Sequence, residues 1–358
     1  MTARGVERGA TGTPGRTPLS YPGGVNLFVL GLRRSGTTIL YDALREDPEL
    51  ACYYEPLREE AETIGGGSGA REGDAFAETR VLRERFREQR YPELPIELFN
   101  WGGPRAAEVE LEAELPPHCR DLLAHLLERA PNVAIKETRL HHKIPELAEL
   151  DPQAAVVHLV RDPRAVCASM LLGRRRRTDV YPDAETFFTA RTGRRLWSSR
   201  RISAALLERD RSLDLPADLP DFLRPLVVWK AAFAATGAAG RRRFGDRYAL
   251  VRLEDLRADP RGVLERIYGV IGRSPPDAVL EWTVANLRPE GNVHLGDDPR
   301  WTRAARLIGM QEELEEAGYE RILELEPDGD RPLDLTPPPP RSRLSGLIGR
   351  ARRRLDER

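Results

Sequence analysis

The sequence predicts an α/β fold of three layers, in which helices cover both faces of a central, mainly parallel sheet. Residues 25–30 and 154–160 are short apolar runs rich in β-forming residues, a pattern typical of strands buried on both faces. Three more strands are predicted at 49–54, 132–135 and 248–253, with helical patterns between them. Crossover helices of this kind connect parallel strands, so the five strands are expected to share one sheet.

The segment after the first strand has the spacing of a phosphate-binding loop. Four residues separate Gly31 from Gly36, and Thr37 opens a helical pattern. A strand, a glycine loop and a helix in this order gather backbone N–H groups at the positive end of a helix, which favours an anion. The fold is therefore expected to be P-loop-like.

The loop lacks the lysine that nucleotide kinases and ATPases carry after the second glycine. Thr37 stands there, and Arg33 and Arg34 place the positive charge earlier in the loop. Such a loop suits phosphate but is poorly suited to ATP with magnesium. The alternative is a sharp turn with two solvated arginines.

Composition excludes several classes of protein. The 358 residues carry a formal net charge of −1, which argues against a nucleic-acid partner. Three scattered cysteines have no metal-binding spacing and indicate a reducing compartment. No stretch is long and apolar enough for a transmembrane span, and a cytoplasmic location is expected.

The chain is expected to form one main domain at 25–330, with a variable insert at about 58–118. Residues 1–24 are predicted to be a disordered tail. Residues 331–358 are predicted to be a proline-rich linker and a basic tail. That tail is expected to dock on the main domain or to remain disordered. The alternative is a weak contact with a membrane surface.

Polar residues follow two further predicted strands. Glu55 follows 49–54, and Lys136 follows 132–135. Ligands of open parallel sheets bind outside the carboxyl ends of the strands, so Glu55 is a candidate general base and Lys136 a candidate contact of the transferred group. The alternatives are an N-cap or a salt bridge to Arg34 for Glu55, and a salt bridge to Glu137 for Lys136.

A second anion site is predicted after the strand at 154–160. Asp162 is an expected N-cap and Pro163 an expected first helical residue. Ser169 lies two helical turns beyond the cap, so it should converge with Arg161 at the strand end. A guanidinium fork and a hydroxyl suit a phosphate monoester.

A late loop is predicted at 289–302. Trp301 and Arg303 lie at its end and are expected to close over a nucleotide.

Two phosphate sites at two strand ends resemble those of the PAPS-dependent sulfotransferases, and especially the carbohydrate sulfotransferases. The 5′-phosphosulfate motif resembles Arg33, Arg34, Ser35, Gly36, Thr37 and Thr38, followed by Tyr-Glu-Pro-Leu at 54–57. The 3′-phosphate motif resembles residues 159–166 with Ser169, and residues 251–256 with Asp259-Pro260 resemble a later segment of the family.

The resemblance implies transfer of a sulfuryl group from PAPS to a hydroxyl, usually of a sugar, with PAP as product and no metal. It assigns leaving-group stabilisation to Arg34 and the base to Glu55. The competing hypotheses are a P-loop kinase and a PAP-binding protein without activity.

Overall fold

The computed structural model describes residues 24–58, 70–99, 106–173, 177–192, 199–210, 215–216, 218–288, 295–326, 332–333 and 335. Residues 59–69 and 100–105 of the predicted insert, almost all of the predicted N-terminal tail and most of the predicted C-terminal tail lie outside these residues.

All five predicted strands form, and all of them pair in parallel in the order β2-β3-β1-β4-β5. They are β1 (Leu27–Leu30), β2 (Ala51–Tyr54), β3 (Val133–Glu137), β4 (Ala155–Val160) and β5 (Tyr248–Arg252). The predicted fold class is confirmed. Because β1 lies between β3 and β4, the loop that follows it emerges at the centre of one edge of the sheet.

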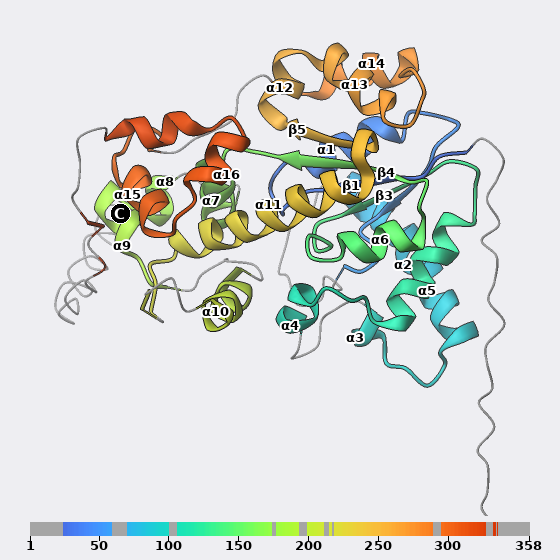
Figure 1. Cartoon of the computed structure of the whole chain (residues 1–358), viewed down its shortest axis with the longest axis horizontal. Helices are drawn as coiled ribbons and strands as arrows, with labels where there is room; N and C mark the ends of the chain where they lie inside the picture. The colour runs from blue at the N-terminus through green and yellow to red at the C-terminus, as the bar shows by residue number, and fades with distance from the viewer. Residues whose placement is uncertain are drawn as a thin grey trace, which may run out of the picture.

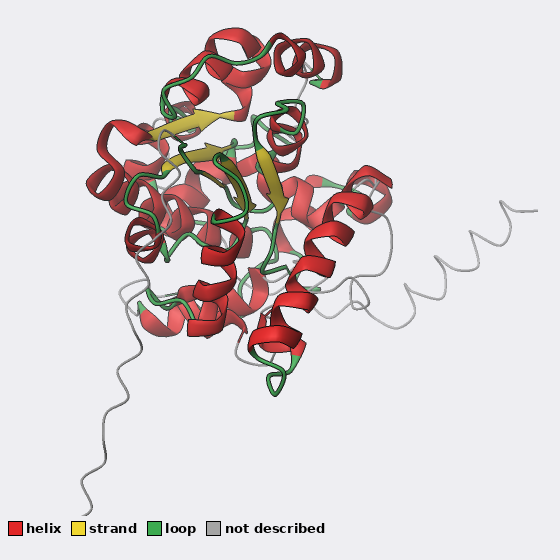
Figure 2. Cartoon of the chain, turned by 90° about the vertical axis from the view of Figure 1, so that its right-hand side faces the viewer, coloured by secondary structure: helices red, strands yellow, loops and turns green. Residues whose placement is uncertain are grey.

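Helices enclose the sheet on both faces, as Figures 1 and 2 show. In the first half of the chain these are α1 (Thr37–Leu44), α2 (Ala70–Arg90), α3 (Ile96–Phe99), α4 (Ala106–Leu111), α5 (Pro117–Leu127), α6 (Ile144–Leu150), α7 (Pro163–Leu172), α8 (Arg177–Val180) and α9 (Ala184–Thr189). In the second half they are α10 (Ser199–Arg209), α11 (Leu223–Phe244), α12 (Leu253–Ala258), α13 (Pro260–Gly269), α14 (Asp277–Asn286), α15 (Arg300–Leu307) and α16 (Gln311–Glu316), with 3-10 turns at Gly245–Arg247 and Glu320–Leu325.

Alternating strand residues supply the two faces of the core. Leu27 and Val29 of β1 pack with α1, α12, α13 and α14, whereas Phe28 and Leu30 pack with α5 and α6. Successive side chains of a strand point to opposite faces, and all four residues of β1 are buried. The uninterrupted apolar run therefore reflects burial on both sides.

A third apolar cluster lies beyond the carboxyl edge of the sheet. It joins α7, α9, α15 and α16 to the N-terminal half of α11. Figure 1 shows α11 running from the sheet to this group of helices. The long helix thus fixes the C-terminal segment beside the edge at which the predicted site residues emerge.

Gly31 is expected to be intolerant of a side chain. A Cβ there would clash with the carbonyl oxygen of Leu159 and lie 2.6 Å from Thr37 Cγ2. We predict that Gly31→Ala lowers the free energy of unfolding by about 1–3 kcal/mol, measured by urea denaturation. Gly269→Ala is the matched control, since a Cβ there meets nothing within 4 Å. Equal stability of both variants would show that the loop does not depend on this close approach.

Candidate functional site

The loop between β1 and α1 ends in a residue whose conformation favours glycine. Gly36 is the N-cap of α1 and has φ of +93°. The backbone N–H of Ser35 donates to Leu32 O at 3.0 Å and closes the turn. The first turn of α1 contains no acidic residue. Its positive helix end is therefore available to an anion, as the motif predicted.

Arg34 connects the two predicted phosphate sites. Its Nε donates to Ser169 Oγ at 2.8 Å, and its carbonyl oxygen accepts from Arg161 Nη1 at 3.1 Å. Asp162 caps α7 as expected, accepting from the N–H of Arg164. Arg161 and Ser169 thus converge, as helical spacing predicted, and the loop arginine lies at the point where they meet.

Arg161 retains a hydrogen-bond donor that has no partner in the described residues. Its Nε is buried and makes no hydrogen bond there. Burial and neighbouring positive charges lower the pKa of Arg161. A buried donor of this kind is stabilised by an acceptor with negative charge.

Glu55 and Lys136 form a buried ion pair with each other. Lys136 Nζ donates to Glu55 Oε1 and lies 4.1 Å from the centroid of the Tyr54 ring. Arg58 Nε lies 3.7 Å from Glu55 Oε2. Burial favours the neutral carboxyl, but the charges of Lys136 and Arg58 outweigh it and hold the pKa of Glu55 below its ordinary value. The alternatives to these candidate roles were a salt bridge of Glu55 to Arg34 and of Lys136 to Glu137. Each residue does form a salt bridge, but the two pair with each other.

Glu137 lies next to this pair and is fully buried. Its two oxygens accept from the N–H groups of Leu57 at 2.8 Å and Thr138 at 3.1 Å. Burial and the charge of Glu55 raise the pKa of Glu137 to about 7. Glu137 therefore holds the segment after β2 against β3.

Arg33 lies close to a buried acidic residue, Glu110. Its Nη2 lies 3.8 Å from Oε2 of Glu110, and Arg139 Nε donates to the same oxygen at 2.7 Å. Glu110 belongs to α4, within the predicted variable insert. No motif in the sequence indicates this contact, because α4 carries none and Glu110 lies 77 positions after Arg33.

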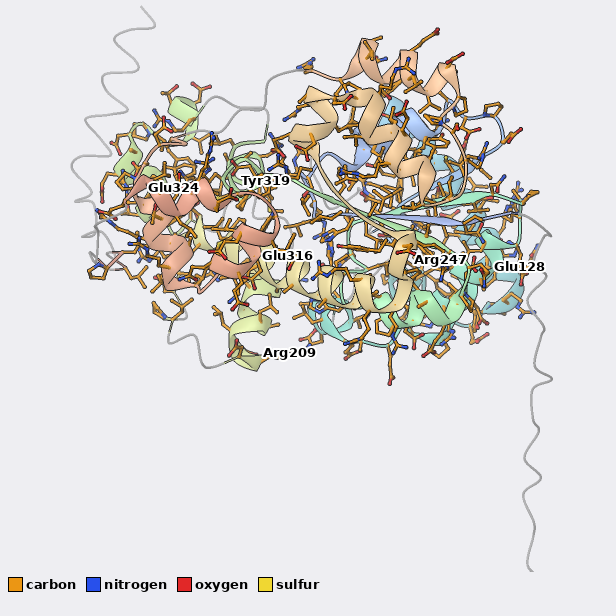
Figure 3. All side chains as sticks on the ribbon, turned by 45° about the horizontal axis from the view of Figure 1, so that its top comes forward. Glu128, Arg209, Arg247, Glu316, Tyr319 and Glu324 are labelled. Carbon is orange, nitrogen blue, oxygen red and sulfur yellow. The ribbon has the colours of Figure 1, made fainter. Side chains whose placement is uncertain are left out.

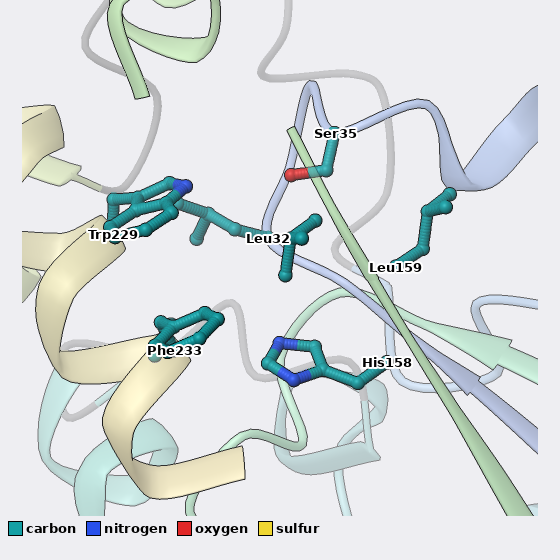
Figure 4. Close-up of a pocket in the computed structure, with 8 residues that line it drawn as sticks. Leu32, Ser35, His158, Leu159, Trp229 and Phe233 are labelled. Atoms are coloured by element: carbon teal, nitrogen blue, oxygen red, sulfur yellow. The ribbon is translucent and has the colours of Figure 1, made fainter. Parts of the chain in front are cut away.

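The remaining loop residues have different surroundings. Thr38 Oγ1 lies 3.0 Å from the hydroxyl of Tyr54, and Thr37 is buried beside Gly31. Ser35 is buried, and its hydroxyl has no hydrogen-bond partner among the described residues. Ser35 lines a small cavity with Leu32, His158, Trp229 and Phe233 (Figure 4).

The structure corrects the expectation for Trp301 and Arg303. The predicted loop ends before them, because α15 begins at Arg300. Trp301 is 1% exposed, donates from Nε1 to Leu295 O at 2.7 Å and packs edge-to-face on Phe187, Phe188 and Phe222. Arg303 donates to both carboxylate oxygens of Glu326, at 2.7 and 2.6 Å. Aromatic packing thus holds the indole in the core, where it cannot stack on a nucleotide.

The described residues contain no group of three or more His, Cys, Asp or Glu side chains placed to hold a metal ion. None of their helices has the length and apolar character needed to cross a membrane.

Part of the sequence is similar to known sulfotransferases. Residues 26–178 match the family described as the Sulfotransferase family. A segment of 172 residues is 31% identical to carbohydrate sulfotransferase 1 of Danio rerio, covering 45% of this chain and 34% of that protein. The match thus spans about a third of the length of the curated relative. These findings confirm the predicted resemblance to the sulfotransferases over this part of the chain.

Solved structures also align with most of the chain. Sulfotransferase STF9 from Mycobacterium avium has a TM-score of 0.44 and 16% identity, over 83% of this chain and 77% of that one. The sulfotransferase domain of the Synechococcus PCC 7002 olefin synthase has a TM-score of 0.39 and 18% identity, over 89% and 99%.

The raised pKa of Glu137 predicts a pH dependence of stability. Between its ordinary value of 4.5 and about 7, the folded state keeps a proton that the unfolded chain has lost. Stability should therefore fall as pH rises through this interval. Because Glu137→Gln has no such proton, its unfolding free energy relative to wild type should increase from pH 5 to pH 8 in urea denaturation.

The control for Glu137→Gln is Glu281→Gln, which replaces an exposed glutamate on α14. A Glu137→Gln difference that stays constant from pH 5 to pH 8 would show that Glu137 titrates normally.

Proposed function

We propose that this protein transfers a sulfuryl group from PAPS to a hydroxyl of a carbohydrate or similar alcohol and releases PAP. One observation carries the proposal. Arg34 belongs to the loop at 31–36 before α1, here called the anion loop, and it contacts both Arg161 and Ser169. The Glu55–Lys136 pair lies at the same end of the sheet. The match of residues 26–178 to the Sulfotransferase family supports this reading of the site.

The residues at this edge fit a nucleotide with two separate phosphates. The N-terminal amides of α1 and Arg34 would hold the 5′-phosphosulfate, and Arg161 with Ser169 would hold the 3′-phosphate. The unpartnered, buried Nε of Arg161 supports this second site, because it offers a donor to the phosphate. Bound PAPS would supply an activated sulfuryl group, whose charge the guanidinium groups and loop amides can stabilise.

Glu55 and Lys136 would act together on the acceptor side. Glu55 is held ionised by Lys136, so it can accept a hydrogen bond from an acceptor hydroxyl and then its proton. A negatively charged group bound beside Lys136 would compete for its ammonium. That competition would weaken the ion pair and raise the pKa of Glu55, which makes the carboxylate a stronger base.

Ligand-dependent stability tests the nucleotide class. PAP at 100 times its Kd should raise the unfolding free energy by about 2.7 kcal/mol, seen as a higher Tm. ATP with magnesium should produce no comparable shift, because the loop has Thr37 where kinases carry lysine. Stabilisation by ATP with magnesium alone would instead support a P-loop kinase. PAP binding without sulfate transfer to any acceptor would support a non-catalytic PAP-binding protein.

Arg34→Ala should lower the rate of sulfate transfer by about 100- to 1000-fold, with a smaller loss of PAP affinity. The reason is that Arg34 would meet charge that develops mainly in the transition state. Single-turnover assays with labelled PAPS measure the rate, and calorimetry measures PAP binding. Arg34→Lys should recover part of the rate. Arg85→Ala, on the exposed side of α2, is the control. An equal loss of affinity and rate would limit Arg34 to binding.

Glu55→Gln should retain PAP binding and lose transfer, since the amide keeps the shape of the side chain but accepts no proton. PAP binding and transfer are both measured, and the Tm of the variant is determined first. The Tm is needed because the substitution leaves Lys136 buried without its ionised partner, which can destabilise the fold. A Glu55→Gln protein with normal turnover would assign the base to another group. Loss of PAP binding would make Glu55 a structural partner of the loop.

A further inference from the structure

The first turn of α12 packs against the anion loop on one side and the segment after β4 on the other. A Cβ at Gly36 would lie 2.7 Å from Leu253 Cδ2, so the Leu253 side chain covers that glycine. Glu254 Oε1 accepts from the N–H of Asp162 at 3.2 Å. The start of α12 therefore contacts both of the segments that make up the predicted nucleotide site.

Arg257 lies one helical turn after Leu253. Residues four apart share a face of a helix, so Arg257 extends the face that covers Gly36. Its Nε is buried and has no hydrogen-bond partner among the described residues, as is also true of Arg161 Nε. The charge of Arg257 is, after burial, the largest influence that lowers the pKa of Arg161. Arg257 and Arg161 thus each carry a buried donor without a partner, and the contact of Glu254 with Asp162 joins α12 to the segment that holds Arg161.

The acidic groups that act on Arg161 are engaged elsewhere. Asp162 accepts from the N–H, Nε and Nη2 of Arg164, the last at 2.6 Å. The second oxygen of Glu254 accepts from the hydroxyl of Tyr319, labelled in Figure 3, at 2.7 Å. No salt bridge of Arg161 or Arg257 occurs within the described part of the chain. Buried, unpaired guanidinium donors are costly, which favours an anion between them.

We propose that Arg257 is a further binding residue of the 3′-phosphate site and donates with Arg161 to the same phosphate monoester. This inference rests on the proposed function. Two planar guanidinium groups and the Ser169 hydroxyl suit a dianionic monoester and not a neutral ribose hydroxyl. α12 would thereby contribute, with Arg161 and Ser169, to the preference for a nucleotide with a 3′-phosphate over one without it.

Calorimetry of the full chain with PAP and with 5′-AMP tests this assignment. Wild type should bind PAP more tightly than AMP. Arg257→Ala should weaken PAP binding by about 10- to 100-fold and leave AMP binding unchanged, because AMP lacks the phosphate that Arg257 would contact. Arg257→Lys should recover part of the loss. Arg261→Ala, an exposed arginine on the adjacent α13, should bind both nucleotides like wild type.

The outcomes separate the inference from the proposed function. Unchanged PAP affinity in Arg257→Ala, or equal weakening of PAP and AMP binding, would overturn the role of Arg257 while leaving PAP binding by wild type intact. A wild-type protein that does not bind PAP would refute the proposed function itself. If Arg257→Ala does not unfold cooperatively, Arg257→Gln is used in its place. The glutamine amide keeps a neutral hydrogen-bond donor and removes the charge.

Discussion

The candidate site depends on the left-handed backbone of Arg34. This residue has φ of +75°, a conformation that costs a non-glycine residue about 1–3 kcal/mol unless its surroundings hold it there. Arg161 binds its carbonyl oxygen and Ser169 binds its side chain. The turn thus places one guanidinium between a loop after β1 and a helix after β4. Because Arg161 directly follows β4 and Ser169 lies on α7, the loop and the proposed second phosphate site are expected to respond to ligand as one unit.

Glu55 is a second non-glycine residue with positive φ, at +42°. Its N–H donates to the carbonyl oxygen of Lys136 at 2.8 Å, while its carboxylate pairs with the Lys136 ammonium. A backbone hydrogen bond and a side-chain ion pair thus both join Glu55 to Lys136. At this end of the sheet, Arg34 and Arg161 follow β1 and β4, and the Glu55–Lys136 ion pair lies at the ends of β2 and β3. In the proposed reaction, the arginines would bind the anionic donor and Glu55 would contact the hydroxyl acceptor.

The sequence predicted the features that depend on local pattern. Apolar runs located all five strands, and Asp162 with Pro163 located the start of α7, which in turn placed Ser169 near Arg161. Features that depend on contacts between distant segments escaped prediction. Glu110 reaches Arg33 only because α4 packs beside the loop, and Trp301 is buried because three phenylalanines from other segments surround it. Arg257 follows a recognisable segment, but its approach to Arg161 depends on how α12 packs.

Labelled PAPS offers the sharpest test of sulfuryl transfer at this end of the sheet. The purified full chain would be incubated with sulfur-labelled PAPS and a carbohydrate-containing cell extract, and both the labelled product and the PAP formed would be quantified. We expect label in a sulfate ester of a hydroxyl compound, with one PAP released for each ester formed. No label in any acceptor, in a protein that binds PAP and has the wild-type Tm, would contradict the claim.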